Sequence, residues 1–445
     1  MKKICMTALL AMAALTGATA QDEKPTVSFK IPVAEGKTKS FAVALKPGAA
    51  PAKIRIDWGD GNIVESDVEI AVYDIYGVPT SLQGKPVGTG VVRLFGPDIA
   101  SLDITLNAKL DEEKVTEIDV TNAPELIDLT AASNDIEAVD FSRNPRLERV
   151  SLTNNRLTQA DFSANPDIVR IELINNSVSS IALPDEPKVE YLQLNGNPLG
   201  RLDISGMPKL KSLYAVGCGL TEFVSGDNTE LKTLSLSKNS LTALDITRLT
   251  GLGLSNKGSL SATDNKLTEL KWSEFPRIVN IDRNCFALDR LPVPENTPYR
   301  YTYGGQTVAV PATVDGQLDL SAQATLTGLA DGPQPTSFIV VAMGDEPAEL
   351  AEGTDYTIDN GVITFSRAFD SVVVRMSTQA FPATVAAPAV TTPFGVAVAT
   401  AICKPAVAGA TPREVFSLQG VPMGSEPARL PKGIYISNGK KIVVK

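Results

Sequence analysis

An asparagine recurs at a fixed interval through the middle of the chain. The slot returns every 21 residues without slipping, and a cysteine fills it once. The positions are Asn134, Asn155, Asn176, Asn197, Cys218 and Asn239. A unit of this length cannot bury its own apolar residues, so successive units must stack and share one core. The period therefore predicts a solenoid of stacked coils.

Apolar residues stand at fixed positions around the slot, in the pattern L-x-x-L-x-L-x-x-N-x-L. One unit places them at Leu147, Val150, Leu152 and Leu157, around Asn155. In a strand, the two-residue period of side chains points the L-x-L residues inward. A sharp turn after the strand brings backbone N–H and C=O groups into the stack, where an amide side chain can satisfy both kinds. We expect the slot residues to form a buried structural ladder.

This pattern resembles the leucine-rich repeat family, which also accepts cysteine in the asparagine slot. The resemblance covers residues 91–292 and implies a mainly β fold, a leucine-rich repeat solenoid of about 21-residue repeats flanked by small β domains. We expect about eight to nine coils, the first of them degenerate, with extended or 3₁₀-like segments on the convex side. Extra residues around 252–258 are predicted to form a loop on one coil.

Residues 1–20 have the composition of a cleaved signal peptide. Lys2 and Lys3 precede a short apolar run, and Ala18-Thr19-Ala20 supplies small residues at the cleavage site. This predicts export, so that the protein is secreted or held at the cell surface. No later stretch reaches the roughly 18 uninterrupted apolar residues of a membrane span, so no transmembrane segment is expected. The mature chain keeps an odd number of cysteines, which we interpret as structural thiols.

Residues 21–90 alternate apolar and polar side chains, which is typical of β-strands. They include Trp58-Gly59-Asp60-Gly61, which is similar to the W-G-D-G turn of polycystic-kidney-disease-type β-sandwich domains. Asp-Gly is hairpin chemistry, so a plain turn is the simpler interpretation, and a calcium site is the alternative. We expect a separate N-terminal β region.

The repeat is absent beyond Pro292. Residues 293–381 contain strand-like runs separated by Asp-Gly, Gly-Pro and Asn-Gly turns, which predicts a β-sandwich-like domain. A Pro- and Ala-rich linker is expected over 382–410.

The last segment, 411–445, contains short strands, the run Leu430-Pro431-Lys432-Gly433-Ile434-Tyr435 and a terminal lysine. It resembles the C-terminal sorting module of Bacteroidota proteins exported through the type IX secretion route. The resemblance implies surface delivery and makes the outer-membrane secretion machinery a partner. The alternative interpretation is a β-hairpin that packs on the preceding domain.

Composition narrows the function classes. Asp and Glu number 51 against 41 Lys and Arg, and this acidity disfavours nucleic acid as a partner. Histidine is absent, which removes the commonest general base and the usual transition-metal ligand. We therefore expect no catalytic residue, no cofactor and no metal. A carboxylate-based glycosidase is a minor hypothesis, because it needs only two acids at a fixed separation, whereas the acids here are scattered.

The outward residues of the predicted strands are the candidate binding site, because they would line the concave face of the sheet. Tyrosine and arginine often anchor interfaces, since they bury a large area and keep a polar end. The candidate residues are Arg149, Ser151, Arg170, Glu172, Tyr191, Gln193 and Tyr214. The leading hypothesis is a non-enzymatic protein that binds a protein or glycan through this face. The alternative is a passive structural or spacer protein of the cell envelope, which the Ser- and Thr-rich later coils favour.

Overall fold

The computed structural model describes most of the chain between residues 23 and 444. The described ranges are 23–32, 37–49, 53–68, 80–96, 98–106, 114–254, 258–295, 298–310, 313–381, 387–398, 415–418, 422–424, 431–437 and 440–444. Within them, helical structure is confined to α1 (Thr250–Leu254) and the 3₁₀ turns η1 (Leu288–Arg290) and η2 (Ser321–Gln323). The predicted signal peptide, 1–20, lies outside these ranges. The described fold is almost entirely β.

Two compact units divide the chain. The first comprises residues 1–309, 325–337 and 375–392, and the second comprises 310–324, 338–374 and 393–445. The first unit contains the repeats.

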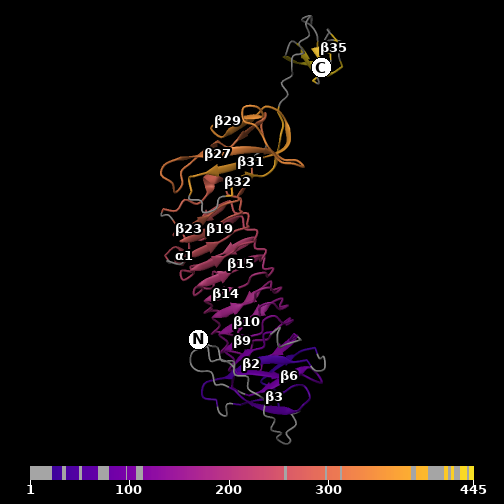
Figure 1. Cartoon of the computed structure of the whole chain (residues 1–445), viewed down its shortest axis with the longest axis vertical. Coiled ribbons are helices and arrows are strands. Elements are labelled where there is room, and N and C mark those ends of the chain that lie inside the picture. Colours follow the sequence, from indigo (N-terminus) through magenta and orange to yellow (C-terminus); the bar gives the residue numbers. More distant parts are fainter. Residues whose placement is uncertain are drawn as a thin grey trace. The chain divides into compact units, whose positions relative to one another are not determined.

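One long sheet of 12 strands runs through the first unit. Its strands in spatial order are β5 (Thr80–Gly84), β2 (Lys39–Leu45), β7 (Ile99–Asp103), β9 (Asp128–Thr130), β10 (Arg149–Ser151), β12 (Arg170–Glu172), β14 (Tyr191–Gln193), β16 (Ser212–Tyr214), β18 (Thr233–Ser235), β20 (Ser259–Ser261), β22 (Ile278–Asn280) and β23 (Arg300–Thr302). From β7 onward the pairs are parallel. Figure 1 shows these strands stacked along the unit.

The middle residue of each short strand points into the core. Val150, Ile171 and Leu192 lie opposite one another in register and are at most 1% exposed, while their neighbours on both sides are half-exposed. Burying such a side chain contributes roughly 1.5–3 kcal/mol, and each coil gains it only when the next coil covers it. The solenoid is therefore stabilised by neighbours along the stack.

The other side of the coils is extended, as 21-residue repeats predict. Short strands pair there in parallel, namely β11 (Ala160–Asp161) with β13 (Ile181–Ala182), β15 (Arg201–Asp203) with β17 (Glu222–Val224), and β19 (Ala243–Asp245) with β21 (Glu269–Lys271). The insertion expected as a loop at 252–258 overlaps the one-turn helix α1, which runs from Thr250 to Leu254; residues 255–257 lie outside the described ranges.

A residue in the left-handed conformation precedes each slot of the ladder and makes the turn sharp. These residues are Ser133, Asn154, Asn175, Gly196, Gly217, Lys238, Asp264, Arg283 and Gly305, with φ between 52° and 74°. Asparagine, aspartate and glycine adopt this conformation most easily. At Gly196 there is a second reason for glycine, because an added Cβ would lie 2.6 Å from Oδ1 of Asn175.

The slot side chains hydrogen bond across coils. Nδ2 of Asn176 donates to the carbonyl oxygens of Leu152 at 2.9 Å and Leu173 at 3.1 Å, and its Oδ1 accepts the backbone N–H of Leu157 at 3.0 Å. The same pattern occurs at Asn134, Asn155 and Asn197. It continues at Asn239, Asn265 and Asn284. Each amide thus closes a turn of the preceding coil and of its own.

Cys218 fills its slot differently. Its Sγ lies 3.2 Å from the carbonyl oxygen of Leu194, and Oδ1 of Asn239 accepts the N–H groups of both Cys218 and Leu220. Burial raises the pKa of the Cys218 thiol, so the group stays protonated and acts as a weak donor. Cys218 and Cys285 are both free thiols.

The N-terminal region is continuous with the solenoid, which corrects the expectation of a separate β region. A five-stranded sheet has the order β4 (Ile63–Asp67), β3 (Lys53–Asp57), β6 (Val91–Phe95), β1 (Val27–Lys30) and β8 (Glu117–Asp119). Strands β2 and β5 join the long sheet in antiparallel pairing. Residues 91–95, predicted to open the first repeat, belong to the five-stranded sheet. The apolar end of the first coil is thus covered by antiparallel strands, which also protects the sheet edge.

The solenoid also extends past the predicted boundary at 292. Strand β23 pairs in parallel with β22, and Gln306 takes the place of the asparagine: its Nε2 donates to the carbonyl oxygens of Ile281 and Tyr303 at 2.9 and 2.7 Å. The rings of Tyr301, Tyr303 and Phe381 pack at this end, with centroids 5.4–6.2 Å apart. Aromatic side chains, each burying a large area, therefore close the last coil.

The region predicted as one β-sandwich-like domain, 293–381, contributes strands to both units. In the first unit, β24 (Thr307–Val308) pairs with β32 (Ala389–Thr391), and β26 (Thr325–Leu326) pairs with the start of β27 (Gln334–Ala342). In the second unit, β25 (Gln317–Asp319), β30 (Val362–Phe365) and β29 (Tyr356–Asp359) form a three-stranded sheet. There, β27 also pairs with β28 (Ala348–Glu349), and β31 (Phe369–Thr378) with β33 (Phe394–Val396).

The linker predicted over 382–410 is partly ordered into this sheet structure. Strands β32 and β33 fall inside it because Ala389, Thr391 and Val396 are buried against other strands. The C-terminal segment forms a four-stranded sheet in the order β35 (Pro422–Gly424), β34 (Val415–Phe416), β36 (Gly433–Ser437) and β37 (Lys440–Val444).

Candidate functional site

The predicted binding residues lie in two adjacent columns on the outward face of the long sheet. Arg149, Arg170 and Tyr191 are direct neighbours in one column. The second column holds Ser151, Glu172, Gln193 and Tyr214. Parallel strands in register place such residues about 4.8 Å apart from coil to coil. The structure therefore brings the predicted residues together on one face of the long sheet.

Arg170, Tyr191 and Tyr214 form a continuous stack across three coils. The guanidinium carbon of Arg170 lies 3.8 Å from the centroid of the Tyr191 ring, which is a close cation–π contact. The rings of Tyr191 and Tyr214 are 5.7 Å apart and inclined at 46°. We call these three residues the Arg–Tyr patch. It presents planar side chains side by side on a flat sheet.

Neighbouring polar groups hold the patch in place. Glu172 forms an ion pair with the guanidinium of Arg170, and the hydroxyl of Tyr191 donates to Oε1 of Gln193 at 2.9 Å. Burial raises the pKa of Tyr191, and the nearby positive charge of Arg170 opposes that shift. The phenol therefore stays neutral at physiological pH and offers a hydrogen bond, not a charge.

Arg149 does not join the stack. Its Nε donates to Asp128 on the preceding coil at 2.9 Å, a second contact runs to Glu148, and its side chain is only 19% exposed. Ser151 is half-buried and lies at the first coil of the second column, next to Glu172. These two residues form the rim of the patch, and the guanidinium of Arg149 is already engaged by acids of its own sheet.

Later coils carry short hydroxyl side chains where the patch carries large ones. The outward residues of β18 and β20 are Thr233, Ser235, Ser259 and Ser261. The hydroxyl oxygens of Ser237 and Ser261 are 2.9 Å apart, so part of this surface bonds to itself. Such a surface offers little area to bury against a partner.

The W-G-D-G sequence forms a tight turn held by Asp57, which precedes it. Oδ1 of Asp57 accepts hydrogen bonds from the N–H groups of Gly59 at 2.8 Å and Gly61 at 2.9 Å. Its Oδ2 accepts a hydrogen bond from Nη1 of Arg93 at 2.9 Å. The carboxylate is buried, and all of these bonds are internal. Across the described ranges, no three His, Cys, Asp or Glu side chains gather in a way that could hold a metal ion. The turn interpretation accounts for the geometry without an ion.

A second column of buried asparagines escaped the sequence analysis. Nδ2 of Asn165 donates to the carbonyl oxygens of Phe141 at 3.0 Å and Asn144 at 2.8 Å. Asn144 and Asn228 make equivalent bonds one and three coils away. Two of these residues precede the periodic prolines, as Asn144-Pro145 and Asn165-Pro166. The recurrence of Asn-Pro at the repeat interval was the signal available in the sequence.

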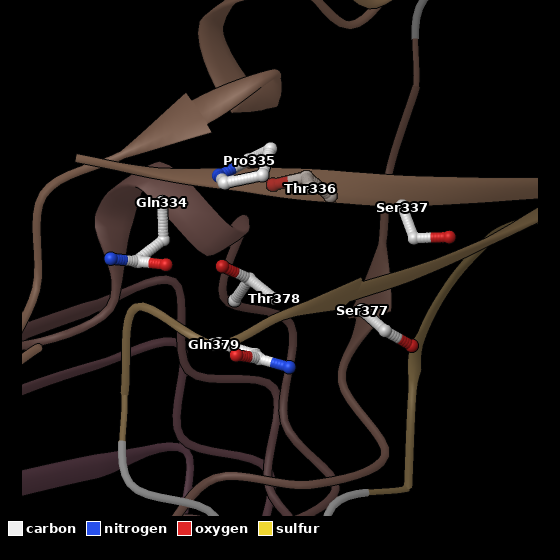
Figure 2. A pocket seen from close by; sticks show the side chains of 7 residues that line it. All are labelled: Gln334, Pro335, Thr336, Ser337, Ser377, Thr378 and Gln379. Atoms are coloured by element: carbon white, nitrogen blue, oxygen red, sulfur yellow. The ribbon is translucent and has the colours of Figure 1, made fainter.

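The first unit also contains a cleft of about 430 Å³ where β27 begins and β31 ends. Its lining residues are Gln334, Pro335, Thr336, Ser337, Ser377, Thr378 and Gln379. Figure 2 shows the two strands diverging around it, with the side chains of Gln334 and Thr378 between them. No sequence motif marks these residues, because they come from two segments about 40 positions apart.

Across the described residues, no helix is both long and apolar enough to cross a bilayer. No protein-family model matches the chain, and no curated protein sequence matches it. Among solved structures, it is similar to the functional domain of InlJ from Listeria monocytogenes, described as including a cysteine ladder, with 19% identity, 67% of each chain covered and a TM-score of 0.44. The fold assignment rests on the coils themselves: the chain is a mainly β solenoid of the leucine-rich-repeat type with small β elements at both ends.

Proposed function

We propose that this chain is a non-enzymatic, exported binding protein that engages a protein or glycan through the Arg–Tyr patch. The stacking of Arg170 on Tyr191, and of Tyr191 beside Tyr214, is the observation that carries the proposal. Residues of these types dominate binding energy where they are found in interfaces, because they combine a large contact area with directional polar groups.

Preorganisation supports the same function. The side chains of Arg170 and Tyr191 are already bonded to Glu172 and Gln193, so a partner would not have to order them. Fixing a side chain on binding costs roughly 0.5–1.5 kcal/mol, and a preformed patch avoids that cost. The surrounding charges are also balanced, since Lys211 pairs with Glu190 at 2.7 Å beside the patch. A partner with a neutral, partly apolar surface fits best.

The test compares two matched triple variants of the mature chain. In the patch variant, Arg170→Ala, Tyr191→Ser and Tyr214→Ser remove the stack. In the control, Thr233→Ala, Ser235→Ala and Ser259→Ala alter the same sheet on adjacent coils. Each protein is immobilised and offered host-tissue extracts and a glycan array. We expect the parent and the control to retain the same partner and the patch variant to lose it. Equal retention by all three would place binding elsewhere.

A passive spacer is the second candidate function, and the hydroxyl surface of β18 and β20 favours it. A spacer needs stability and length but no anchor residues. The spacer hypothesis predicts that the parent protein captures no partner from host-tissue extracts or on the glycan array. It also predicts that the patch variant has no defect in the native host. That result would replace the binding proposal.

Delivery to the surface is proposed for the C-terminal sheet of β34 to β37. Tyr435, within the L-P-K-G-I-Y run, is buried in it, and its hydroxyl donates to the carbonyl oxygen of Pro431 at 2.9 Å. Solenoid coils depend on their neighbours, so deleting residues 411–445 should leave the stack folded. In the native host we expect the shortened chain to accumulate in the periplasm. Surface delivery at the parental level would show that the segment carries no sorting function.

A further inference from the structure

A column with basic residues lies at the C-terminal end of the solenoid, on the edge where the coils enter the long sheet. The residues just before β18, β20, β22 and β23 are Lys232, Gly258, Arg277 and Tyr299. The backbone carbonyl oxygens of the first three each accept an N–H from the following coil, at 2.9, 3.0 and 3.2 Å. Coils in this register are about 4.8 Å apart. The side chains of Lys232, Arg277 and Tyr299 therefore follow one line along the edge.

Two exposed arginines at this end of the solenoid differ from those in earlier coils. Most of the earlier ones form ion pairs with neighbouring acids, including Arg149, Arg170, Arg201 and Arg248. Across the described residues, neither Arg277 nor Arg300 forms an ion pair, and the same holds for the exposed Lys232. The formal net charge of the whole chain is −10. This edge is therefore a locally basic surface on an acidic protein.

Tyr299 supplies an exposed aromatic ring between the two arginines. It directly precedes Arg300, is 74% exposed, and its ring centroid lies 5.2 Å from the guanidinium carbon of Arg277. The segment that carries Arg277 is anchored through Phe275, whose ring meets those of Trp272 and the buried Tyr301 edge-on, with centroids 5.3 and 5.8 Å away. An anchored segment leaves less ordering for a partner to impose.

We call Arg277, Tyr299 and Arg300 the terminal patch, and its chemistry selects a class of ligand. Guanidinium groups bind carboxylates through paired hydrogen bonds, and an aromatic ring offers a flat apolar face. A uronic acid presents both complements, because it has a carboxylate on a sugar ring with an apolar face. An acidic peptide has the carboxylates but no such ring, and the negative charge of the chain disfavours nucleic acid.

We propose that the terminal patch binds a glycan that contains uronic acids. Arg277 and Arg300 bind carboxylates, Tyr299 contacts a sugar ring, and Lys232 attracts a carboxylate further along the glycan. The site is separate from the Arg–Tyr patch, whose last strand, β16, lies three strands before β22 in the sheet. Its partner is also different, since the terminal patch requires a negative charge.

The decisive variant combines Arg277→Gln and Arg300→Gln. Both side chains are exposed, so we expect an unchanged melting temperature and an affinity at least about tenfold lower. Tyr299→Phe should bind like the parent because it keeps the ring, whereas Tyr299→Ser should bind several-fold more weakly. The matched control combines Arg143→Gln and Lys266→Gln. These two residues are exposed, and in the described part of the chain they form no ion pair, so the control removes the same charge elsewhere on the solenoid.

Binding is measured by isothermal titration calorimetry on the mature chain, with tetragalacturonic acid as the probe. Its fully methyl-esterified form is the neutral comparison, and a tetraglutamate peptide represents acidic peptides. We expect the acid to bind the parent and the control alike, and to bind more weakly as salt screens the charges. Four results would each overturn the proposal: the parent does not bind the acid, the ester binds equally well, tetraglutamate binds as tightly, or the control loses as much affinity as the double variant. Binding through the Arg–Tyr patch is tested with other variants, so either proposal can fail alone.

Discussion

Two columns of buried asparagines run along the same solenoid and satisfy different groups. In the slot ladder, Asn176 accepts a backbone N–H, that of Leu157, and donates to carbonyl oxygens. The second column contains Asn144, Asn165 and Asn228 and is called the Asn-Pro column after its first two members; Asn228 also accepts the N–H of Gly226 at 2.9 Å. Asn165 only donates, and its buried Oδ1 has no partner within the described ranges. The carbonyl oxygens it reaches, those of Phe141 and Asn144, each already accept a backbone N–H at 3.1 Å.

The difference shows which groups a repeat must satisfy. A buried N–H has a single hydrogen to place, and orphaned ones are rare, whereas a carbonyl oxygen has two lone pairs and tolerates one unused. The slot ladder therefore supplies something that no other group in the turn supplies. Asn144 and Asn165 of the Asn-Pro column only add second hydrogen bonds to carbonyl groups that are already paired.

The largest expected effect is that of Asn176→Leu. The variant keeps the side-chain size but leaves the buried N–H of Leu157 without an acceptor. It also removes one of the two amide donors to each of the carbonyl oxygens of Leu152 and Leu173, which keep the amides of Asn155 and Asn197. We expect the free energy of unfolding to fall by roughly 2–5 kcal/mol, measured by urea denaturation of the mature chain. A change below about 1 kcal/mol would mean that the N–H of Leu157 finds another acceptor. The slot amides would then not be required to satisfy that N–H.

Asn165→Leu tests the other side of the comparison. Because the carbonyl groups of Phe141 and Asn144 keep their backbone donors, we expect a smaller loss, about 1–2 kcal/mol in the same assay. The variant also removes the buried, unpaired Oδ1 of Asn165, and this gain offsets part of the expected loss in the free energy of unfolding. A loss equal to that of Asn176→Leu would show that both columns are equally necessary.

Cys218→Asn sharpens the comparison within the slot ladder. Leu199, whose counterpart in other coils donates to the slot amide, here donates its N–H to the carbonyl oxygens of Asn197 and Cys218 at 2.9 and 3.0 Å. An asparagine would restore the amide acceptor. We expect a gain of about 0.5–1.5 kcal/mol in the free energy of unfolding. A loss would indicate that the turn has adapted to the smaller thiol.

The smallest effect concerns exposed aspartates that close turns on the opposite side from the long sheet. Asp245 accepts the hydroxyl of Thr247 at 2.7 Å and its N–H at 2.9 Å, and these bonds lower the pKa of Asp245. A lowered pKa contributes stability above the ordinary value of about 3.9, and that stability is lost as the pH falls through the lowered value. Thr247→Val should raise the pKa of Asp245 in an NMR titration and reduce this acid sensitivity. An unchanged pKa would assign the shift to the backbone bond alone.

The repeat itself could be predicted because its period is strict from Asn134 to Asn239. The same logic fails where the spacing changes. Asn284 and Gln306 continue the ladder, but the interval between slots shifts and the last slot holds a glutamine. The pairing of β2 with β7 was also beyond prediction, because antiparallel capping strands follow the alternation of any β-strand and carry no mark of their partner.

The candidate site was predictable only in part. Register alone placed Arg170, Tyr191 and Tyr214 on one face, since parallel coils in step bring every twenty-first residue together. It could not show that the guanidinium of Arg149 is taken up by Asp128, because that depends on rotamers. The cleft between β27 and β31 was invisible for a different reason: its lining comes from two separate segments that meet only in the folded chain and share no sequence pattern.

The slot ladder has a direction. Every amide reaches back to the coil before it, as Asn176 does to Leu152 and Leu157, so a coil is completed by residues that come later in the chain. A chain that emerges N-terminus first, from a ribosome or a secretion channel, would always carry one unfinished coil at its trailing end. Assembly would then proceed in one direction, because the amide of each newly formed coil supplies the hydrogen bonds that complete the coil before it. The N-terminal cap would be its fixed starting point.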